Sequence, residues 1–256
     1  MRVDTNKFTL YHSSNGGGYM LLPKEVHSSW DPFITEEILA ELIVIENEIG
    51  NNFNPSDPDK ILKFLSVNLD NVKVIWLGQD VYPAKGVATG RSFEVGGLND
   101  WLEPFRQVSL KNIVRLIYKN YAGISDYKDI KRFSEIQKEI KNGSFQIKPP
   151  NNIFDSLESQ GVLFLNTSFT CEVGEANSHK IIWKAFSKKV LNYISTQNPD
   201  IKWFLWGKEA ISTKEDIPEG VFFESRHPMM CSEKYQDDFL KFDGFKATMS
   251  EINWLG

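Results

Sequence analysis

Hydrophobic and polar residues follow one another along this chain in blocks that predict strands and helices in alternation. Nearly continuous runs of β-branched and aromatic residues predict buried strands, whereas apolar residues three or four positions apart predict amphipathic helices. By these criteria, strands are expected at 72–78, 161–166, 201–207 and 221–225. Helices are expected at 31–49, 109–121, about 153–159 and 181–195. This order predicts an α/β fold with a central, mostly parallel, four-stranded sheet flanked by helices on both faces.

Two of the expected helices have a candidate capping residue at their start. Asp31 precedes Pro32 at the head of the first helix, and an acid followed by proline is typical of a helix N-terminus. Ser109 opens the second helix, where its hydroxyl can accept a hydrogen bond from an otherwise unpaired backbone N–H. Both residues are expected to cap.

The chain is expected to form one large domain over residues 29–256. With 256 residues, 41% of them hydrophobic and 13% aromatic, it can bury a substantial core. Residues 1–28 are polar and contain SSNGGG, so they are expected to be an N-terminal extension. Residues at about 122–150 are charged and weakly periodic, and they end in Lys148-Pro149-Pro150, so they are expected to be an insertion.

Charge argues against a protein that coats nucleic acid through bulk electrostatics. The formal net charge is −5 and the sequence pI is about 5.5, whereas neutralising phosphates needs clustered cations. A local basic face stays open, with a solvated helix face as the alternative. Its candidates, at helical spacing, are Lys180, Lys184, Lys188 and Lys189, and Lys111, Arg115 and Lys119.

Cysteine and histidine usage predicts a protein of a reducing compartment without a metal site. Cys171 and Cys231 are too few for a disulfide framework, and His12, His27 and His179 show no metal-ligand spacing. No apolar run has the length of a signal peptide or a membrane span. We therefore expect no contact with a membrane, and a cytoplasmic location, or a nuclear one if the host has a nucleus.

Polar side chains follow all four expected strands. They are Gln79, Asp80 and Tyr82 after the first strand, Asn166 at the end of the second, Lys208 after Gly207 at the end of the third, and His227 after the fourth. Because the carboxyl ends of parallel strands meet at one edge of a sheet, and ligands bind outside that edge, these side chains are expected to converge.

The converging groups suit a pocket for a flat heterocycle. Asp80 can orient a water molecule or stabilise a developing cation, and His227 can donate a hydrogen bond to an oxygen that gains negative charge. Asn166 can donate and accept at once, as the polar edge of a pyrimidine requires. Tyr82 and Phe93 can supply a wall and a stacking face. Each residue alone also has a structural explanation, as a loop acid, a turn residue or a core aromatic.

Five blocks of sequence resemble, in order and spacing, the signature blocks of the family 1 uracil-DNA glycosylases. They are GQD-x-Y at 78–82, GVLFLNTSFT at 161–170, EANSHK at 175–180, WFLWGKEA at 203–210 and the HP of ESRHPMM at 224–230. Weaker likenesses are SWDPF at 29–33 and SLKNI at 109–113, while the expected extension and insertion match nothing in the family. The resemblance implies a uracil-DNA glycosylase-like fold.

The resemblance also implies a reaction and the residues that perform it. A monofunctional hydrolase would cut the N-glycosidic bond of deoxyuridine in DNA, releasing uracil and leaving an abasic site, in base excision repair and without a cofactor. By similarity, Asp80 would position the attacking water and stabilise the sugar cation, and His227 would stabilise the departing uracil anion. Substrate-binding residues would be Gln79, through its backbone, Tyr82, which rejects thymine, Phe93, which stacks on the base, and Asn166, which reads the polar edge of the base.

Contacts to DNA are implied by the same resemblance. They would come from Ser109, Gly207, Lys208, Pro228, Met229, Met230 and Ser232. The segment Pro228–Ser232 would be the wedge loop, which enters the duplex as the base leaves it. Its sequence HPMMCS lacks the usual leucine, and the stretch WLEPFRQVS at 101–109 has one proline where the family has several. Single-stranded DNA, which needs no wedge, is therefore expected as a substrate beside duplex DNA.

The first block departs from the family pattern at two positions. It reads GQDVYP where the family has GQDPYH, so Val81 and Pro83 replace a proline and a histidine. The Tyr-Pro pair resembles the poxvirus branch of the family. Neither change removes a proposed catalytic group, but Val81 loosens the restraint on the backbone beside Asp80.

Two other functions stay open at this stage. One is a catalytically weakened DNA-binding or protein-interaction module on the same fold, and the other is a glycosylase for another damaged base. The expected partners are uracil-containing DNA, single- or double-stranded, and a proteinaceous inhibitor as a further candidate. The protein is expected to be a monomer.

Overall fold

A four-stranded parallel sheet forms the centre of the molecule. The computed structural model describes residues 21–256, so most of the expected N-terminal extension lies outside the described part. The strands are β2 (Val74–Gly78), β3 (Val162–Asn166), β5 (Lys202–Trp206) and β6 (Val221–Ser225). They lie in the order β3-β2-β5-β6, and every neighbouring pair is parallel. The predicted α/β fold and its four strands are confirmed.

Strand order places the end of β2 in the middle of the carboxyl edge. Because β2 lies between β3 and β5, the loop that follows Gly78 emerges between the ends of its two neighbours. The register pairs Gly78 with Asn166, so the first signature block and the end of β3 lie side by side. A separate antiparallel pair, β1 (Phe53–Asn54) and β4 (Cys171–Glu172), was not predicted, since its strands have two residues each.

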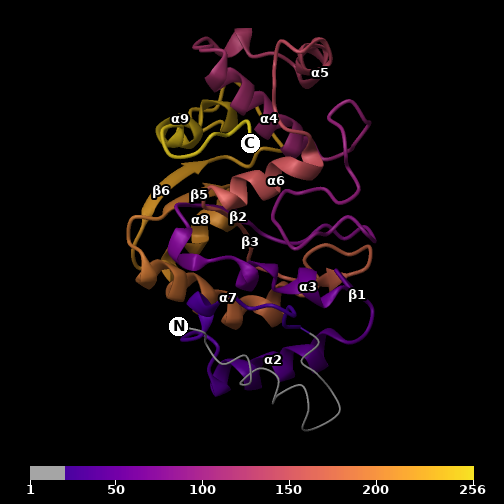
Figure 1. Ribbon diagram of the computed structural model, residues 1–256, viewed down its shortest axis with the longest axis vertical. Helices are drawn as coiled ribbons and strands as arrows, with labels where there is room; N and C mark the ends of the chain where they lie inside the picture. The colour runs from indigo at the N-terminus through magenta and orange to yellow at the C-terminus, as the bar shows by residue number, and fades with distance from the viewer. Residues whose placement is uncertain (1–20) are drawn as a thin grey trace.

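Helices cover both faces of the sheet (Figure 1). The α-helices are α2 (Glu36–Ile49), α3 (Pro58–Ile61), α4 (Val108–Tyr121), α5 (Phe133–Asn142), α6 (Pro150–Ser159), α7 (Lys180–Gln197), α8 (Lys208–Ser212) and α9 (Gly244–Thr248). Short 3-10 helices are η1 (Ser28–Trp30), η2 (Lys63–Ser66), η3 (Leu69–Asn71), η4 (Tyr127–Asp129), η5 (Thr213–Asp216) and η6 (Phe239–Lys241). None of these helices, within residues 21–256, is long and apolar enough to cross a membrane.

Alternate residues of each strand enter two different cores, as the period of a strand requires. Ile75 and Leu77 belong to the core that includes α2 and α7, whereas Val74 and Trp76 belong to the core that includes α4, α6 and α9. Figure 1 shows α2 and α7 at one end of the molecule and α4, α5 and α9 at the other. Burial on both faces explains why β2, β3 and β5 have nearly continuous apolar sequences, whereas the edge strand β6 is buried only in part.

Both predicted caps are wrong. Helix α2 begins at Glu36, and its cap is Thr35, whose hydroxyl accepts a hydrogen bond from the Ile38 backbone N–H at 3.3 Å. Asp31 lies earlier, in the turn after η1. Helix α4 begins one residue before Ser109, so Ser109 lies inside the first turn and cannot occupy the extended cap position.

The expected insertion contains a helix that its weak periodicity did not predict. Helix α5 buries Phe133 and Ile136 in the same core as α4, and Ile130 and Phe145 on either side of it are buried as well. Few apolar positions stand among many charged ones in this segment, so the sequence pattern did not predict the helix.

At the other end of the described chain, Leu21 is buried in the core beside α2.

Candidate active site

One cavity of about 500 Å³ opens at the carboxyl edge of the sheet. Residues from the ends of all four parallel strands line it, together with the start of α4. The sequence-predicted site residues on its wall are Gln79, Asp80, Tyr82, Phe93, Ser109, Asn166, Gly207, Lys208, His227 and Met229. Pro228, Met230 and Ser232 are not part of the wall, but they belong to the same wedge loop as Met229. The structure therefore brings the predicted residues together, while their individual roles stay predictions.

Asp80 has one oxygen engaged and one without a partner. Its Oδ2 accepts a hydrogen bond from the Asn177 backbone N–H, and its buried Oδ1 has no hydrogen-bond partner within residues 21–256. Burial raises the pKa of the Asp80 carboxyl above its ordinary value, although the hydrogen bond from Asn177 opposes this shift. A fixed carboxylate with an unused oxygen is suited to orient a water molecule or a substrate group.

Asn177 holds this arrangement and was missed by the sequence analysis. Its backbone is left-handed, with φ of 64°, which asparagine tolerates better than most residues. Its Oδ1 accepts a hydrogen bond from Gln79 Nε2 at 2.8 Å, so the side chain of Gln79 is engaged and its predicted role through the backbone is consistent. The EANSHK block contains Asn177, but the signal for its role is the left-handed turn, which only coordinates reveal.

Asn166, at the end of β3, is buried with an unsatisfied amide. Its side-chain oxygen has no hydrogen-bond partner in the described part of the chain, and such a group costs about 1–3 kcal/mol unless a ligand satisfies it. Gly78 on β2 makes room for it, because a Cβ at Gly78 would lie 2.3 Å from Asn166 Oδ1. The glycine of the first block is thus required by the amide beside it.

Phe93 is held in a strained backbone conformation. Its φ is 63°, a left-handed value that is rare for a bulky residue and typical of functional sites. Its ring packs edge-to-face against Trp206, with centroids 5.1 Å apart, and remains partly exposed to the cavity. The ring can therefore stack on a flat ligand while its own edge is fixed by the core.

Arg91 anchors the loop that carries Phe93, and the sequence analysis missed it too. Its guanidinium is 9% exposed and donates to Glu158 at 2.7 and 2.8 Å, to Asp155 at 2.6 Å and to Glu94. Three carboxylates thus compensate one buried cation and fix the loop to α6. No local spacing signals this cluster, because two of its acids lie more than sixty residues away along the chain.

Tyr82 and its loop are fixed through the backbone. Asn54 Nδ2 donates to the Tyr82 carbonyl at 2.6 Å, which ties the loop after β2 to β1. Burial raises the pKa of Tyr82, so its phenol is neutral. Val81, the residue that replaces the family's proline, packs in a small buried cluster with Ala88 and Cys171. Packing therefore restrains the backbone that proline would otherwise restrain.

His227 lies at the rim of the cavity, exposed on one side. Its Nδ1 accepts a hydrogen bond from the Met229 backbone N–H at 3.2 Å, so the proton of the neutral ring is assigned to Nε2. Desolvation by the surrounding protein lowers the pKa of His227 below its ordinary value. Gly207 allows the close approach of the ring, because a Cβ there would lie 3.0 Å from His227 Cβ. The neutral ring can thus donate a hydrogen bond through Nε2.

The wedge loop presents two exposed methionines and is tied down at its start. Met229 and Met230 are 57% and 65% exposed. Asn112 Nδ2, from α4, donates to the Pro228 carbonyl at 2.6 Å. The sequence analysis missed Asn112 as well, although a polar residue on the buried face of an amphipathic helix was a usable signal, since such a group must be hydrogen-bonded.

The candidate basic faces are mostly compensated by acids or carbonyls. The ion pairs on α7 are Lys180 with Glu209, Lys188 with Asp216, and Lys189 with Glu37 and Glu41. On α4, Lys119 donates to the Leu240 carbonyl and Arg115 to that of Lys131. The alternative of a solvated helix face therefore describes α7 better than a basic patch, because Lys180, Lys188 and Lys189 are paired with acids.

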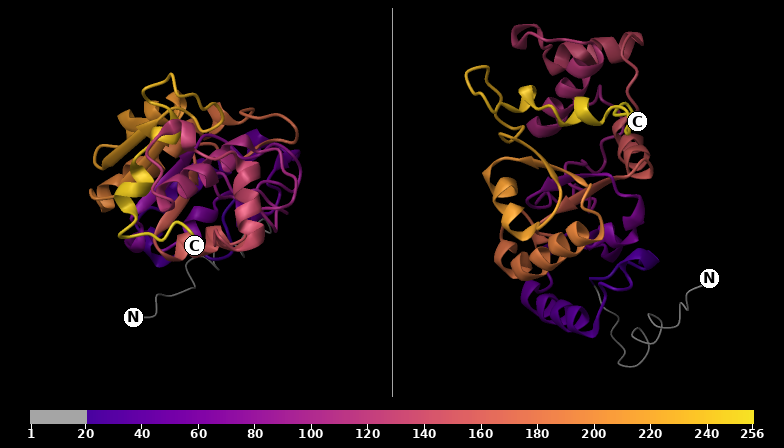
Figure 2. Two further views of the ribbon diagram at one scale, coloured as in Figure 1. Left: turned by 90° about the horizontal axis from the view of Figure 1, so that it is seen from above. Right: turned by 90° about the vertical axis from the view of Figure 1, so that its left-hand side faces the viewer.

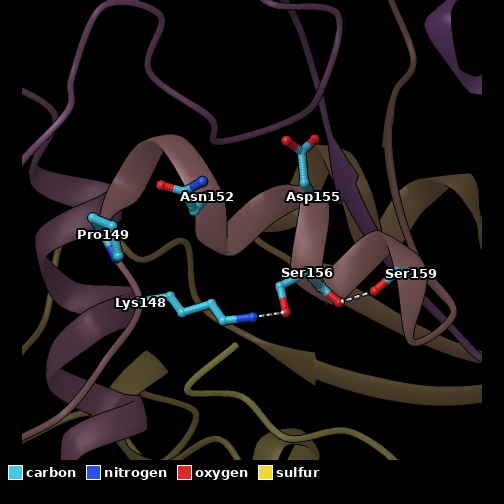
Figure 3. A pocket seen from close by; sticks show the side chains of 6 residues that line it. All are labelled: Lys148, Pro149, Asn152, Asp155, Ser156 and Ser159. Atoms are coloured by element: carbon cyan, nitrogen blue, oxygen red, sulfur yellow. Dashed lines mark hydrogen bonds between the residues drawn. The ribbon is translucent and has the colours of Figure 1, made fainter.

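No cluster of three or more side chains that could hold a metal ion occurs within residues 21–256. A second hollow, of about 470 Å³, lies along α6, and Figure 3 shows its side chains. There Lys148 Nζ donates to Ser156 Oγ at 2.8 Å, while Asp155 points away from Lys148 and pairs with Arg91. These groups are already engaged and lie away from the strand ends, so we assign the chemistry to the first cavity.

The fold and the cavity define an α/β protein with a pocket at the carboxyl edge of its parallel sheet. No family model matches the chain. Among curated proteins, the uracil-DNA glycosylase of Francisella philomiragia is 30% identical over 214 residues, which cover 80% of this chain and 86% of that protein. Uracil-DNA glycosylase 1 of Listeria innocua is 31% identical over 211 residues, covering 78% and 82%. The chain belongs to the uracil-DNA glycosylase family.

Solved structures agree on the fold. The UNG of Nitratifractor salsuginis matches with a TM-score of 0.64 and 20% identity, over 90% of this chain and 91% of that one. A mimivirus UNG variant in complex with UGI matches with a TM-score of 0.63 and 18% identity, over 92% and 99%. The predicted resemblance to the family 1 uracil-DNA glycosylases is confirmed, while the likeness of the Tyr-Pro pair to the poxvirus branch stays a prediction.

Proposed function

We propose that this enzyme hydrolyses the N-glycosidic bond of deoxyuridine in DNA, releasing uracil and leaving an abasic site, as a monofunctional glycosylase of base excision repair. The observation that carries this proposal is the meeting of Asp80, Asn166 and His227 on one cavity of about 500 Å³. Membership of the family supports the same reaction.

Duplex substrate has to change shape before it reacts. A base stacked in a duplex cannot enter the cavity, so the nucleotide must rotate out of the helix, at a cost of roughly a few kcal/mol in stacking and pairing. The flexible, apolar side chains of Met229 and Met230 are suited to fill the space that the base leaves. Single-stranded DNA avoids this cost and is proposed as a substrate as well.

Recognition of the base is assigned to Asn166, Phe93 and Tyr82. The Asn166 amide would pair with the N3–H and O4 edge of uracil while Phe93 stacks on its face. Cytosine presents an amino group in place of O4, so a fixed amide would meet it donor to donor, at a cost of about 1–3 kcal/mol. Tyr82 would exclude the 5-methyl group of thymine by volume.

Cleavage of the glycosidic bond moves its electron pair onto uracil and leaves positive charge on the sugar. His227 would donate a hydrogen bond from Nε2 to the uracil oxygen that gains negative charge. Asp80 would stabilise the sugar cation and orient a water molecule. That water adds its oxygen to C1′ and passes a proton to Asp80, and the departing uracil anion is protonated by solvent.

An oligonucleotide assay tests the proposal. Wild-type protein is expected to release uracil from a uracil-containing strand, so that subsequent alkali cleaves the strand at that position. Asp80→Asn keeps the shape of the side chain and removes its charge, and is expected to slow release by roughly 10²–10⁴-fold. An uncut strand would favour a DNA-binding or protein-interaction module instead. Cutting at another damaged base, but not at uracil, would favour a glycosylase for that lesion.

Finer statements about partners and location belong to the proposal too. The mimivirus UNG variant was solved in complex with UGI, so a proteinaceous inhibitor is a candidate partner here. We propose a monomer. Cys171 and Cys231 are both unpaired, which supports a reducing location such as the cytoplasm or nucleus.

A further inference from the structure

The segment between α4 and α5, which the family resemblance leaves unmatched, is hydrogen-bonded toward both ends of the wedge loop. We infer that this segment braces the loop and so determines how well the enzyme acts on duplex rather than single-stranded DNA. The inference rests on the proposed function. In the views of Figure 2, the magenta segment around α4 and α5 lies beside the yellow C-terminal segment, as the hydrogen bonds between them require.

Two chains of hydrogen bonds, here called struts, connect the segment between α4 and α5 to the wedge loop, and the first strut reaches the end of the loop. Tyr127, in η4, donates its phenolic hydrogen to Asp238 Oδ1 at 2.9 Å, and the other oxygen of Asp238 accepts from the Ser232 backbone N–H at 2.6 Å. Asp238 is 1% exposed, so its carboxylate depends on these donors and on the Leu240 backbone N–H for compensation. Removing the Tyr127 hydroxyl therefore weakens the anchor of Ser232.

The second strut reaches the start of the loop. The Lys131 carbonyl, just before α5, accepts from Arg115 Nε at 2.8 Å, and Arg115 Nη1 donates to Asn112 Oδ1 at 2.8 Å. The amide of Asn112 then donates from Nδ2 to the Pro228 carbonyl at 2.6 Å. Arg115 fixes the orientation of this amide, because a flipped amide would oppose two donors to each other.

Between the two struts the loop makes few bonds of its own. The Met230 backbone N–H donates to the His227 carbonyl at 3.2 Å, and the Met229 N–H donates to the His227 ring. The exposed methionines thus depend on the ends of the loop for their position. A loop that is already ordered loses less conformational entropy when it enters a duplex. An unpaired uracil reaches the cavity without the wedge, so its release should not depend on the order of the loop.

The test compares uracil release from one oligonucleotide as a single strand and as a duplex, in the full-length protein. Tyr127→Phe removes one hydroxyl, and we expect it to lower kcat/KM for the duplex by about three- to tenfold relative to the single strand. Tyr121→Phe is the matched control, because its hydroxyl bonds Asn253 and the Trp254 backbone and not the loop. It is expected to leave the ratio unchanged.

Arg115→Met interrupts the second strut and is expected to lower the same ratio. Lys111→Met removes a charge from the same helix without touching the strut, since Lys111 lies over the Phe105 ring, and controls for electrostatics. Equal loss on both substrates, or equal effects of strut variants and controls, would overturn the inference. If the wild type releases uracil from neither substrate, the proposed function itself fails.

Hydrogen–deuterium exchange gives a readout that needs no catalysis. In Tyr127→Phe, the backbone amides of 229–232 are expected to exchange several-fold faster than in the wild type, because the Ser232 N–H loses part of its acceptor's support. In Tyr121→Phe they should exchange as in the wild type. Unchanged exchange in Tyr127→Phe would show that the hydrogen bond from Tyr127 does not restrain the wedge loop. That result would refute the inference even if the activities differed.

Discussion

Burial shifts the pKa values of the two proposed catalytic residues in opposite directions. It disfavours the charged form of each, which is the deprotonated form of an aspartate and the protonated form of a histidine. The pKa of Asp80 is raised above 3.8 and that of His227 is lowered below 6.5. At neutral pH the lowered pKa leaves His227 neutral, with its Nε2–H available as a donor, and the proposed mechanism uses Asp80 as the carboxylate. A neutral imidazole can donate a directed hydrogen bond to the uracil oxygen while its own protonation state stays the same.

The pH profile follows from the signs of these shifts. Asp80 acts as the carboxylate, so kcat/KM is expected to fall on the acid side through an ionisation above pH 3.8, at higher pH than an exposed aspartate would give. Because its pKa is lowered, His227 becomes cationic only at a pH below that of an ordinary imidazole. In His227→Gln the plateau should drop while the acid limb keeps its position. A limb that disappears with the histidine would reassign it to the imidazole.

At the scale of elements, one buried cation connects the Phe93 loop to α6. Arg91→Met keeps the aliphatic volume but leaves Glu94 and Glu158 uncompensated, and we expect it to destabilise the protein by about 3–5 kcal/mol in urea unfolding. Uracil release, measured well below the unfolding midpoint, should also slow because Phe93 loses its anchor. Asp155→Asn is the control: Asp155 is 69% exposed, so less than about 1 kcal/mol should be lost. Equal losses in both variants would contradict the anchor.

The strands were predictable from sequence and most long-range anchors were not. Two apolar faces give strands such as Val74–Gly78 a continuous signal, and parallel alternation places their carboxyl ends together. That is why Asp80, Asn166 and His227 could be assigned to one pocket. Contacts of Arg91 with Asp155 and Glu158 depend on how distant elements pack, and no local period encodes them. The same holds for the left-handed Asn177 that fixes Asp80.

At the scale of the whole molecule, the charge distribution predicts modest nonspecific attraction to DNA. The net charge is −5, and three lysines of α7, Lys180, Lys188 and Lys189, already form ion pairs with acidic side chains. Lys208 lines the cavity and has no ion-pair partner within residues 21–256, so it is available to a phosphate. We therefore expect the enzyme to find its substrate through the shape of the pocket and wedge loop more than through a basic surface.

The salt dependence of activity measures how many phosphates the protein neutralises. Each phosphate contact contributes a slope of about −0.7 for single strands in a plot of log kcat/KM against log salt concentration. With few unpaired cations at the cavity, we expect a slope shallower than about −3, and Lys208→Ala should reduce its magnitude by roughly 0.7. Lys180→Ala, which removes a cation already paired with Glu209, should leave it unchanged. A slope much steeper than −3 would mean that DNA displaces the acids from their lysines, so that the helix faces act as a basic surface after all.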